Sequence, residues 1–218
     1  QTCCSGAGQE GGNEMSPTII ECEQGTEIWL RARMGMPTSS EFSTVMAAAK
    51  DGKERKTRNT YMYKLAGEIL TGEPMESYRD ANMERGSLME DEARNFYAFT
   101  TDDEIKRVGF VVNGNCGCSP DSLVGKSGIF EAKSAFPHIL IDKLLRDDFP
   151  PEHKAQCQGN LMVVEREWID IGIYWPNLPM FKKRAYRDES YISHMRNEID
   201  QFNAELHELV EKIRRYGA

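Results

Sequence analysis

The chain has 218 residues, of which 39% are hydrophobic and 28% are charged, a composition typical of a folded globular protein. Its net charge is −8, from 27 Lys and Arg residues against 35 Asp and Glu residues. This balance excludes a protein that coats nucleic acid over its whole surface, because such binding depends on neutralising phosphates. It is compatible with an enzyme that has a local basic groove and clustered acids. No apolar run reaches the roughly 18–20 residues that span a bilayer, so no membrane association is expected.

Residues 1–14 are polar and rich in glycine, so we expect a disordered leader or a cloning remnant, followed by a single domain over residues 15–218. The start lacks the basic-then-apolar pattern of a secretory signal. The six cysteines are not spaced like a disulfide framework, and Cys116 and Cys118 have no second pair of Cys or His at zinc-site spacing. These features indicate a reduced, cytoplasmic setting.

Helices are expected over most of residues 26–99. Phe42, Val45 and Met46 recur at helical spacing, and Thr71-Gly72 is a stop signal. The predicted helices are 26–33, 41–49, 60–70 and 81–99. They are separated by a break at 35–38, a loop rich in Lys and Arg at 50–58, and a loop at 74–80.

Strands are expected mainly in the second half of the chain. The predicted strands are 106–112, 119–123, 129–134, 162–167 and 168–174, with a hairpin turn at 113–115. Further helices are expected at 136–146 and 153–160. This order predicts an α/β fold with a central mixed sheet flanked by helices.

Residues 189–216 are expected to form one long C-terminal helix. Its apolar residues step by three and four, which makes one continuous stripe. The stripe consists of Ile192, Met195, Ile199, Phe202, Leu206, Leu209 and Ile213. Packing against the domain's own core is favoured over an intermolecular coiled coil.

The most informative motif is Asp121, followed ten residues later by Glu131-Ala132-Lys133. If 129–134 is a strand, Glu131 and Lys133 point to the same side, and turn residues at 125–128 bring Asp121 there as well. Carboxylates are ligands for hard divalent cations, and a lysine beside them handles the proton of a water nucleophile. The pattern therefore predicts a metal-dependent phosphodiesterase site. A chance spacing, with a salt-bridged strand end, is the alternative.

Further motifs follow the same order and spacing as those of a known family. They are WLRARMG at 29–35, TSS at 38–40, GSLMEDEAR at 86–94, CSPD at 118–121, EAK at 131–133 and QCQ at 156–158. Over residues 24–175 the chain resembles the phage lambda exonuclease family of alkaline exonucleases, also called YqaJ-type viral recombinases. That family belongs to the restriction-endonuclease-like superfamily. The segment TSS departs from the commoner TAS, which is a conservative change.

The resemblance implies a 5′-to-3′ exonuclease on double-stranded DNA ends. Such an enzyme prefers a 5′-phosphate, releases mononucleotides and leaves a 3′ overhang. The overhang passes to a single-strand annealing recombinase for recombination. The resemblance also implies a ring-shaped homotrimer that encloses the DNA, encoded by a phage or prophage and acting in the host cytosol.

By position, the resemblance makes Asp121, Glu131 and the carbonyl of Ala132 the ligands of two Mg²⁺ ions, for which Mn²⁺ is a substitute. Lys133 would orient or deprotonate the attacking water. Glu90 would be a further ligand or an acceptor for metal-bound water, and both roles stay open.

Other matched positions concern the substrate strand. Gln158, with Gln156 close by, would hold the strand or the catalytic lysine. Arg33, Ser40 and Ser119 match positions that bind the terminal 5′-phosphate. A planar guanidinium beside hydroxyl donors suits a phosphate dianion.

The basic loop is expected to contact the duplex through Lys50, Lys53 and Arg55. His138 and His153 lie near the motifs in sequence and are read as structural or surface residues. An iron–sulfur nuclease of the same superfamily is excluded, because it needs a late cysteine cluster and none follows Cys157. A structure-specific endonuclease and a non-catalytic DNA-end-binding protein stay as alternatives.

Overall fold

The computed structural model describes residues 16–47, 56–75 and 81–216. The predicted leader at 1–14 and the loop residues Lys50, Lys53 and Arg55 lie outside these ranges. No helix in the described part of the chain is long and apolar enough to cross a membrane.

The helices are α1 (Glu27–Arg33), α2 (Phe42–Val45), α3 (Lys56–Thr71), α4 (Ala81–Thr100), α5 (Pro137–Arg146), α6 (Lys154–Val164) and α7 (Glu189–Arg214), with short 3-10 turns η1 (Ser39–Glu41) and η2 (Pro151–His153). The strands are β1 (Thr18–Ile20), β2 (Ile105–Lys106), β3 (Phe110–Asn113), β4 (Cys116–Cys118), β5 (Ser122–Val124), β6 (Gly128–Ser134), β7 (Trp168–Tyr174) and β8 (Phe181–Tyr186).

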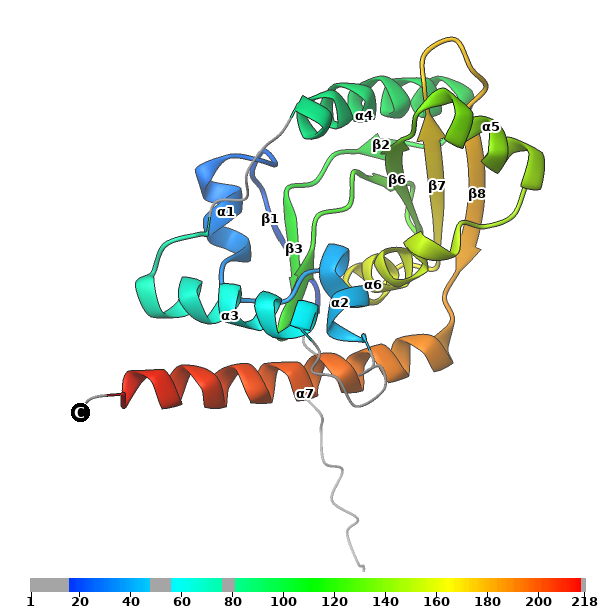
Figure 1. Ribbon diagram of the computed structural model, residues 1–218. Helices are drawn as coiled ribbons and strands as arrows, with labels where there is room; N and C mark the ends of the chain where they lie inside the picture. Colours follow the sequence, from blue (N-terminus) through cyan, green and yellow to red (C-terminus); the bar gives the residue numbers. More distant parts are fainter. Residues whose placement is uncertain (1–15, 48–55, 76–80, 217–218) are drawn as a thin grey trace, which may run out of the picture.

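The main sheet has the strand order β2-β5-β6-β7-β8. Only β6 and β7 run parallel, and the other neighbours are antiparallel. Helix α4 covers one face, where the Tyr97 ring stacks on Phe130 with 4.0 Å between ring centroids. Helix α6 covers the other face, where Leu161 packs with Ile129 and Ile171 (Figure 1). The α/β fold with a mixed sheet flanked by helices is thus confirmed.

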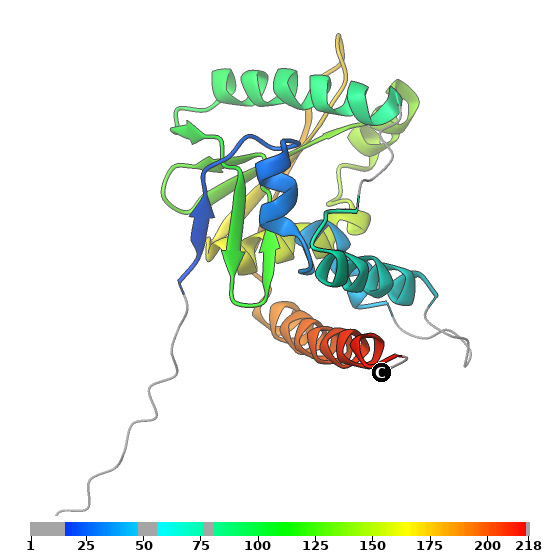
Figure 2. The ribbon, with the colours of Figure 1, turned by 90° about the vertical axis from the view of Figure 1, so that its left-hand side faces the viewer.

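A smaller sheet of order β1-β3-β4 lies beside the main one (Figure 2). Figures 1 and 2 both show the long helix α7 running beneath α3. Its stripe from Ile192 to Leu206 is buried against the chain's own core, as expected, and then continues to Val210. Ile213 is 46% exposed, because a straight helix repeats every 3.6 residues and drifts away from a seven-residue repeat.

Two strand predictions are wrong. Residues 106–112 do not form one strand, because β2 and β3 belong to different sheets. Between them lies Gly109, where a Cβ would stand 2.4 Å from the carbonyl oxygen of Cys22. Residues 162–167 were expected to be a strand, but α6 continues through Val164 and ends at Glu165 in a left-handed conformation. The apolar run of that helix is buried on all sides, which hides the helical period.

Strand β8 was not predicted, because its Lys and Arg residues are typical of a loop. In the structure they lie on an edge strand, where charged residues are also common. One of them, Arg184, donates two hydrogen bonds to Asp170 on β7 and lies 3.6 Å over the Trp168 ring. Tyr97 on α4 donates a third hydrogen bond to the same carboxylate at 2.7 Å. This buried network ties α4 to the sheet.

Replacing Tyr97 with Phe is expected to lower the free energy of unfolding by about 1–3 kcal/mol, because it removes a buried hydrogen bond to a charged group. Chemical denaturation measures the effect. Tyr63→Phe is the control, since Tyr63 is 57% exposed on α3. Equal stability of both variants and the parent protein would contradict the role given to this bond.

Candidate active site

The carboxylate cluster lies where the pairing of β5 with β6 ends. The last paired residues are Ser122 and Phe130, so beyond Phe130 this edge of β6 has no neighbouring strand within residues 16–47, 56–75 and 81–216. The Asp121 side chain takes the place of the missing strand, and the Ala132 amide donates to its Oδ2 at 2.6 Å. In a strand, the N–H and C=O of one residue point to the same side. The Ala132 carbonyl therefore faces the open edge beside Asp121.

Glu131 is buried on the α6 face of β6, two residues from Lys133 and on the same side. Lys133 Nζ donates to Glu131 Oε1 at 2.7 Å, and Gln156 donates to the same oxygen at 2.6 Å. Asn160 donates to Oε2 at 2.9 Å. Both carboxylate oxygens are thus fixed by side chains of α6 and β6.

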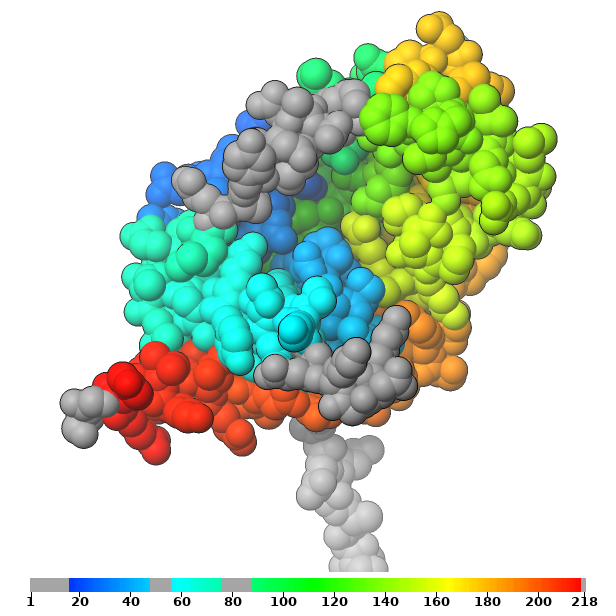
Figure 3. All heavy atoms as spheres, in the orientation of Figure 1, coloured from blue at the N-terminus to red at the C-terminus, as the bar shows by residue number. Residues whose placement is uncertain are grey.

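Glu90 reaches the cluster from α4. It lies one turn before Ala93 and two turns before Tyr97, and these two residues pack on the sheet. Glu90 and Asp121 line one cavity of about 400 Å³ together with Trp29. Figure 3 shows the surface hollowed between the blue and cyan spheres of α1, α2 and α3 and the green and yellow spheres of β6, α5 and α6.

Three acidic side chains share this site with one lysine. Burial, and then the charge of Glu131, raise the pKa of Asp121 well above its usual value. Burial also raises the pKa of Glu90, against the opposing effect of Lys133. Burial alone would lower the pKa of Lys133, but Glu131 and Asp121 outweigh it and raise that pKa. The site therefore carries an excess of negative charge that a cation would relieve.

The donor set fits a hard divalent cation. The carboxylates of Asp121, Glu131 and Glu90 and the carbonyl of Ala132 supply only oxygen atoms, which such cations prefer. Within the described residues, no three side chains of His, Cys, Asp or Glu converge as a ready-made metal centre.

A second group of polar side chains adjoins the carboxylates. Arg33 lies one helical turn after Trp29 on α1, with its guanidinium 4.2 Å from the indole centroid. Trp29 Nε1 donates to Ser119 Oγ at 2.7 Å. Because Ser119 is two residues before Asp121, this contact joins α1 to the metal-ligand candidates.

The hydroxyls around Arg33 complete this group. Arg33 donates to Thr38 Oγ1 at 3.2 Å, and the Thr38 and Ser40 hydroxyls are 3.3 Å apart. The segment is held beside β4, since the Gly117 amide donates to the Pro37 carbonyl at 3.1 Å. Among the ion pairs of the described residues none includes Arg33, whose pKa is lowered chiefly by burial. A guanidinium that has no carboxylate partner in the described part of the chain, beside two hydroxyls, suits a phosphate.

The structure does not bring Gln158 to the carboxylates. Its amide donates to the Tyr186 carbonyl at 2.8 Å and accepts from the Asp188 amide at 2.8 Å, so it fixes the chain between β8 and α7. Gln156 and Asn160 contact Glu131 instead, because residues four apart share one face of a helix. That i, i+4 spacing in the sequence is the signal that identifies them.

The basic loop contributes no described contact to the site. Lys50, Lys53 and Arg55 lie outside the described residues, so their contact with the duplex stays a prediction. Arg58, at the end of the same basic stretch, is buried and pairs with Glu205 on α7. It stabilises the α3–α7 packing.

The two histidines lie near the cluster in different ways. His138 is exposed on α5 and stacks on Phe136 with 6.3 Å between ring centroids. His153 is partly buried on η2, and burial and then Lys133 lower its pKa to about 4. Neither histidine hydrogen-bonds to the carboxylates in the described structure.

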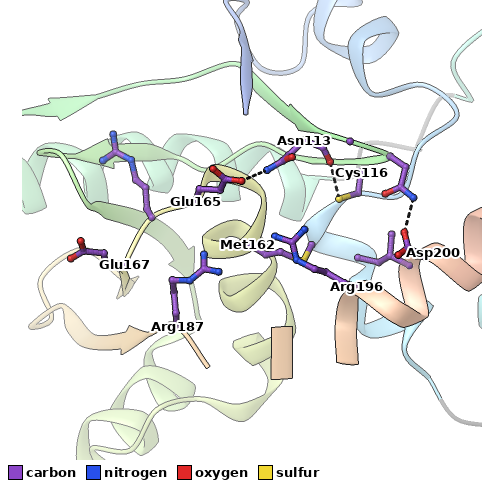
Figure 4. A pocket seen from close by; sticks show the side chains of 12 residues that line it. Asn113, Cys116, Met162, Glu165, Glu167, Arg187, Arg196 and Asp200 are labelled. Carbon is purple, nitrogen blue, oxygen red and sulfur yellow. Dashed lines mark hydrogen bonds between the residues drawn. The ribbon is translucent and has the colours of Figure 1, made fainter. Parts of the chain in front are cut away.

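A larger cavity, of about 660 Å³, lies away from the carboxylates, between the β3–β4 turn, the end of α6, and α7 (Figure 4). Two pairs of its polar side chains hydrogen-bond to each other. Asn113 donates to Glu165 and Asn115 donates to Asp200. Arg187 pairs with Glu189 outside the cavity lining. None of the predicted site residues lines this cavity. It is therefore not the candidate active site, although it is larger than the cavity beside Asp121.

Comparisons with known proteins agree with the fold. Two crystal structures of an alkaline exonuclease (LHK-Exo) from Laribacter hongkongensis, one in complex with dAMP, are 31% identical and superpose with TM-scores of 0.78 and 0.79. The matches cover 88% of this chain and 97% of that chain. A phage related exonuclease from Haemophilus somnus 129PT, 12% identical with a TM-score of 0.62 over 82% of this chain and 96% of that chain, shares the fold.

No curated protein matches the chain significantly. The family profile described as the YqaJ-like viral recombinase domain matches residues 28–167, which include every described member of the site. The chain therefore belongs to the YqaJ-like viral recombinase family.

Proposed function

We propose that this protein is a metal-dependent 5′-to-3′ exonuclease that acts on the ends of double-stranded DNA. The observation that carries the proposal is that Arg33 lies against Trp29 and Trp29 donates to Ser119, which is two residues before Asp121 in the sequence. These contacts support a site in which a group that binds a terminal phosphate adjoins a group that hydrolyses the next phosphodiester. An enzyme that recognises a terminal phosphate and cuts next to it releases mononucleotides. The relative LHK-Exo was crystallised with a mononucleotide, dAMP, which agrees with this product.

Mg²⁺ is the proposed cofactor, with Mn²⁺ as a substitute. Asp121, Glu131 and the Ala132 carbonyl would hold two ions, with Glu90 as a further ligand or as an acceptor for metal-bound water. Bound there, the ions would polarise the phosphodiester and lower the pKa of the attacking water.

The protein's own residues position the reactants. Gln156 and Asn160 hold both oxygens of Glu131, so this carboxylate keeps its place during the reaction. Lys133, held against Glu131, orients the nucleophilic water and handles its proton. Arg33, Ser40 and Ser119 bind the 5′-phosphate and set the distance from the strand end to the scissile bond.

The proposed product is a duplex with a 3′ overhang, which a single-strand annealing recombinase receives. In this proposal the protein acts as a homotrimeric ring that holds the DNA within it. The ring explains how a chain of net charge −8 stays on DNA, because enclosure replaces electrostatic attraction. A mass measurement in solution is expected to give three chains, and a monomer at working concentration would contradict the ring.

A comparison of linear and covalently closed circular duplexes tests the proposed function. With Mg²⁺, digestion of the linear duplex should release acid-soluble nucleotides, while the circular duplex stays intact. Cutting of the circle would support the alternative of a structure-specific endonuclease. Binding of ends without any release of nucleotides would support a non-catalytic end-binding protein.

Gln156 and Gln158, two residues apart on α6, offer a matched pair of variants. Gln156→Ala is expected to lower nucleotide release about tenfold with little change in stability, because it removes a donor that orients Glu131. Gln158→Ala is expected to lower the free energy of unfolding by about 1–3 kcal/mol, because two backbone groups lose their partner. Steady-state kinetics and chemical denaturation separate the two effects, and a reversed pattern would contradict these assignments.

A further inference from the structure

The segment 35–38 joins two of the side chains proposed to bind the terminal 5′-phosphate. Arg33 precedes the segment at the end of α1, and Ser40 follows it in η1. The relative position of these two side chains therefore depends on what holds the segment. Besides its contact with β4, the segment is held by two side chains of α3.

Glu68 of α3 holds the start of the segment. Its carboxylate is 5% exposed and accepts from the Gly35 amide at 2.9 Å and from the Met75 amide at 3.2 Å. Gly35 has a φ of 72°, a left-handed conformation typical of the residue after a helix end. A Cβ there would stand 2.7 Å from Ile69 Cγ1. The turn after Arg33 is thus fixed against α3.

Tyr61 of α3 holds the end of the segment. Its hydroxyl accepts from the Thr38 amide at 3.2 Å, two helical turns before Glu68. Its ring stacks on Phe202 of α7 with 5.7 Å between ring centroids, which fixes the place of the hydroxyl. Burial raises the pKa of Tyr61 to about 12, so the hydroxyl keeps its proton at neutral and moderately alkaline pH.

Thr38 contacts both phosphate-binding side chains. Its hydroxyl accepts from Arg33 at 3.2 Å and lies 3.3 Å from the Ser40 hydroxyl. Thr38 is buried, whereas Ser40 is exposed and accessible to a substrate. Burial has the larger effect on the pKa of Tyr61, but the charge of Arg33 lowers that pKa, because the two side chains lie close together. A shift of the Tyr61 hydroxyl would therefore displace the donors that face the phosphate.

We propose that Tyr61 is a positioning residue that sets the specificity of the enzyme for 5′-phosphorylated ends. Its hydroxyl fixes the Thr38 amide, and Thr38 in turn orients Arg33 and Ser40 toward the phosphate. The inference rests on the proposed function, which assigns Arg33 and Ser40 to the 5′-phosphate. Within the described structure α3 supplies no side chain to the carboxylate cluster, so Tyr61 acts on end recognition and not on hydrolysis.

Tyr61→Phe tests the inference, because it removes the hydroxyl and keeps the ring against Phe202. The measurement is kcat/KM with Mg²⁺ on linear duplexes that have 5′-phosphorylated or 5′-hydroxyl ends. The variant should lose about tenfold on phosphorylated ends, the effect of one hydrogen bond, and less than about twofold on hydroxyl ends. Tyr63→Phe is the matched control. Tyr63 lies on the same helix but is 57% exposed, so this variant should keep the full preference for the phosphate.

Combination with Arg33→Ala separates positioning from a general structural role. Without Arg33 little preference for the phosphate remains, so the addition of Tyr61→Phe should lower kcat/KM on phosphorylated ends by less than about twofold more. A structural defect would instead lower kcat/KM by the same factor in both backgrounds and on both kinds of end.

Thr38→Val tests the same path and leaves Tyr61 unchanged. Thr38 has an extended backbone, with φ −119° and ψ 154°, which Val adopts readily. The substitution puts a methyl group in place of the hydroxyl between Arg33 and Ser40, and it should also lower kcat/KM on phosphorylated ends about tenfold. Thermal unfolding of each variant, with shifts of less than about 4 °C, shows that the fold is retained.

Three results would each overturn the inference while leaving the exonuclease proposal intact. They are equal losses of Tyr61→Phe on both kinds of end, a further tenfold loss in the Arg33→Ala background, and full retention of the preference by Thr38→Val. Failure of the parent chain to release nucleotides from either duplex would overturn the proposed function itself. The two kinds of failure are therefore distinguishable.

Discussion

Replacing Asp121 with Asn is expected to lower Mg²⁺-dependent release of nucleotides by about a thousandfold, because it removes a charged metal ligand at the reacting phosphate. Asn is nearly the same size as Asp, and its carbonyl oxygen still accepts the hydrogen bond from the Ala132 amide. The local backbone should therefore be unchanged. Single-turnover kinetics on a 5′-phosphorylated linear duplex measure the loss.

The same substitution should not destabilise the protein without metal. Burial and the charge of Glu131 raise the pKa of Asp121 above its unfolded value. A raised carboxyl pKa contributes stability that is present below the unfolded pKa and is lost as pH rises through the folded one. At neutral pH the Asp121 carboxyl group is therefore a cost to folding, and Asp121→Asn should unfold at an equal or higher temperature in EDTA.

With Mg²⁺ added, the parent protein should unfold at a higher temperature than Asp121→Asn. A cation that binds only the folded state raises the unfolding temperature of the parent protein, and the variant should gain less. Asp142→Asn is the matched control, because Asp142 is exposed on α5 and pairs with Arg146. Retention of full activity by Asp121→Asn, or a large loss of stability in EDTA, would contradict the role assigned to this carboxylate.

Replacing Arg33 with Ala is expected to abolish the preference for 5′-phosphorylated over 5′-hydroxyl ends. A charge-assisted contact with a phosphate is worth about 2–4 kcal/mol when it is partly buried, so kcat/KM on phosphorylated ends should fall about 30- to 1,000-fold. Activity on hydroxyl ends should change little, because those ends never made the contact. The measurement is kcat/KM on the two substrates.

Arg31→Ala is the control for this variant. Arg31 lies two residues earlier on α1, and its guanidinium pairs with Glu27 and Glu73. It should retain the preference for the phosphate. Arg33→Lys should recover only part of it, because lysine keeps the charge but loses the planar, two-pronged donor. Equal losses on both kinds of end would show that Arg33 serves folding and not end recognition.

Much of the site could be predicted from the sequence because its members lie close together along the chain. Glu131 and Lys133 share one face of a strand by the period of two, and Asp121 reaches them across the single hairpin between β5 and β6. Glu90 and Arg33 could be assigned to the site only from the family resemblance. They are far from the hairpin in sequence, and no helix or strand periodicity connects them with it. In the structure Glu90 lines one cavity with Asp121, and Arg33 lies against Trp29, which donates to Ser119.

The errors arose where tertiary packing overrides local pattern. Gln158 and Gln156 differ by two positions on α6, which is enough to turn one toward the sheet and the other toward the β8–α7 connection. The end of α6 looked like a strand because the helix is buried on every side and shows no polar face. Strand β8 was missed because an edge strand carries the charges that are otherwise typical of loops.

The central claim is that the protein degrades one strand of a linear duplex from its 5′-phosphorylated end. The most direct measurement uses duplexes labelled at the 5′ end or at the 3′ end of the same strand, digested with Mg²⁺ and sampled over time. The account predicts that the 5′ label appears first, as a mononucleotide, and that the 3′ label stays in long strands until digestion is nearly complete. Early release of the 3′ label, or of the 5′ label within longer fragments, would contradict it.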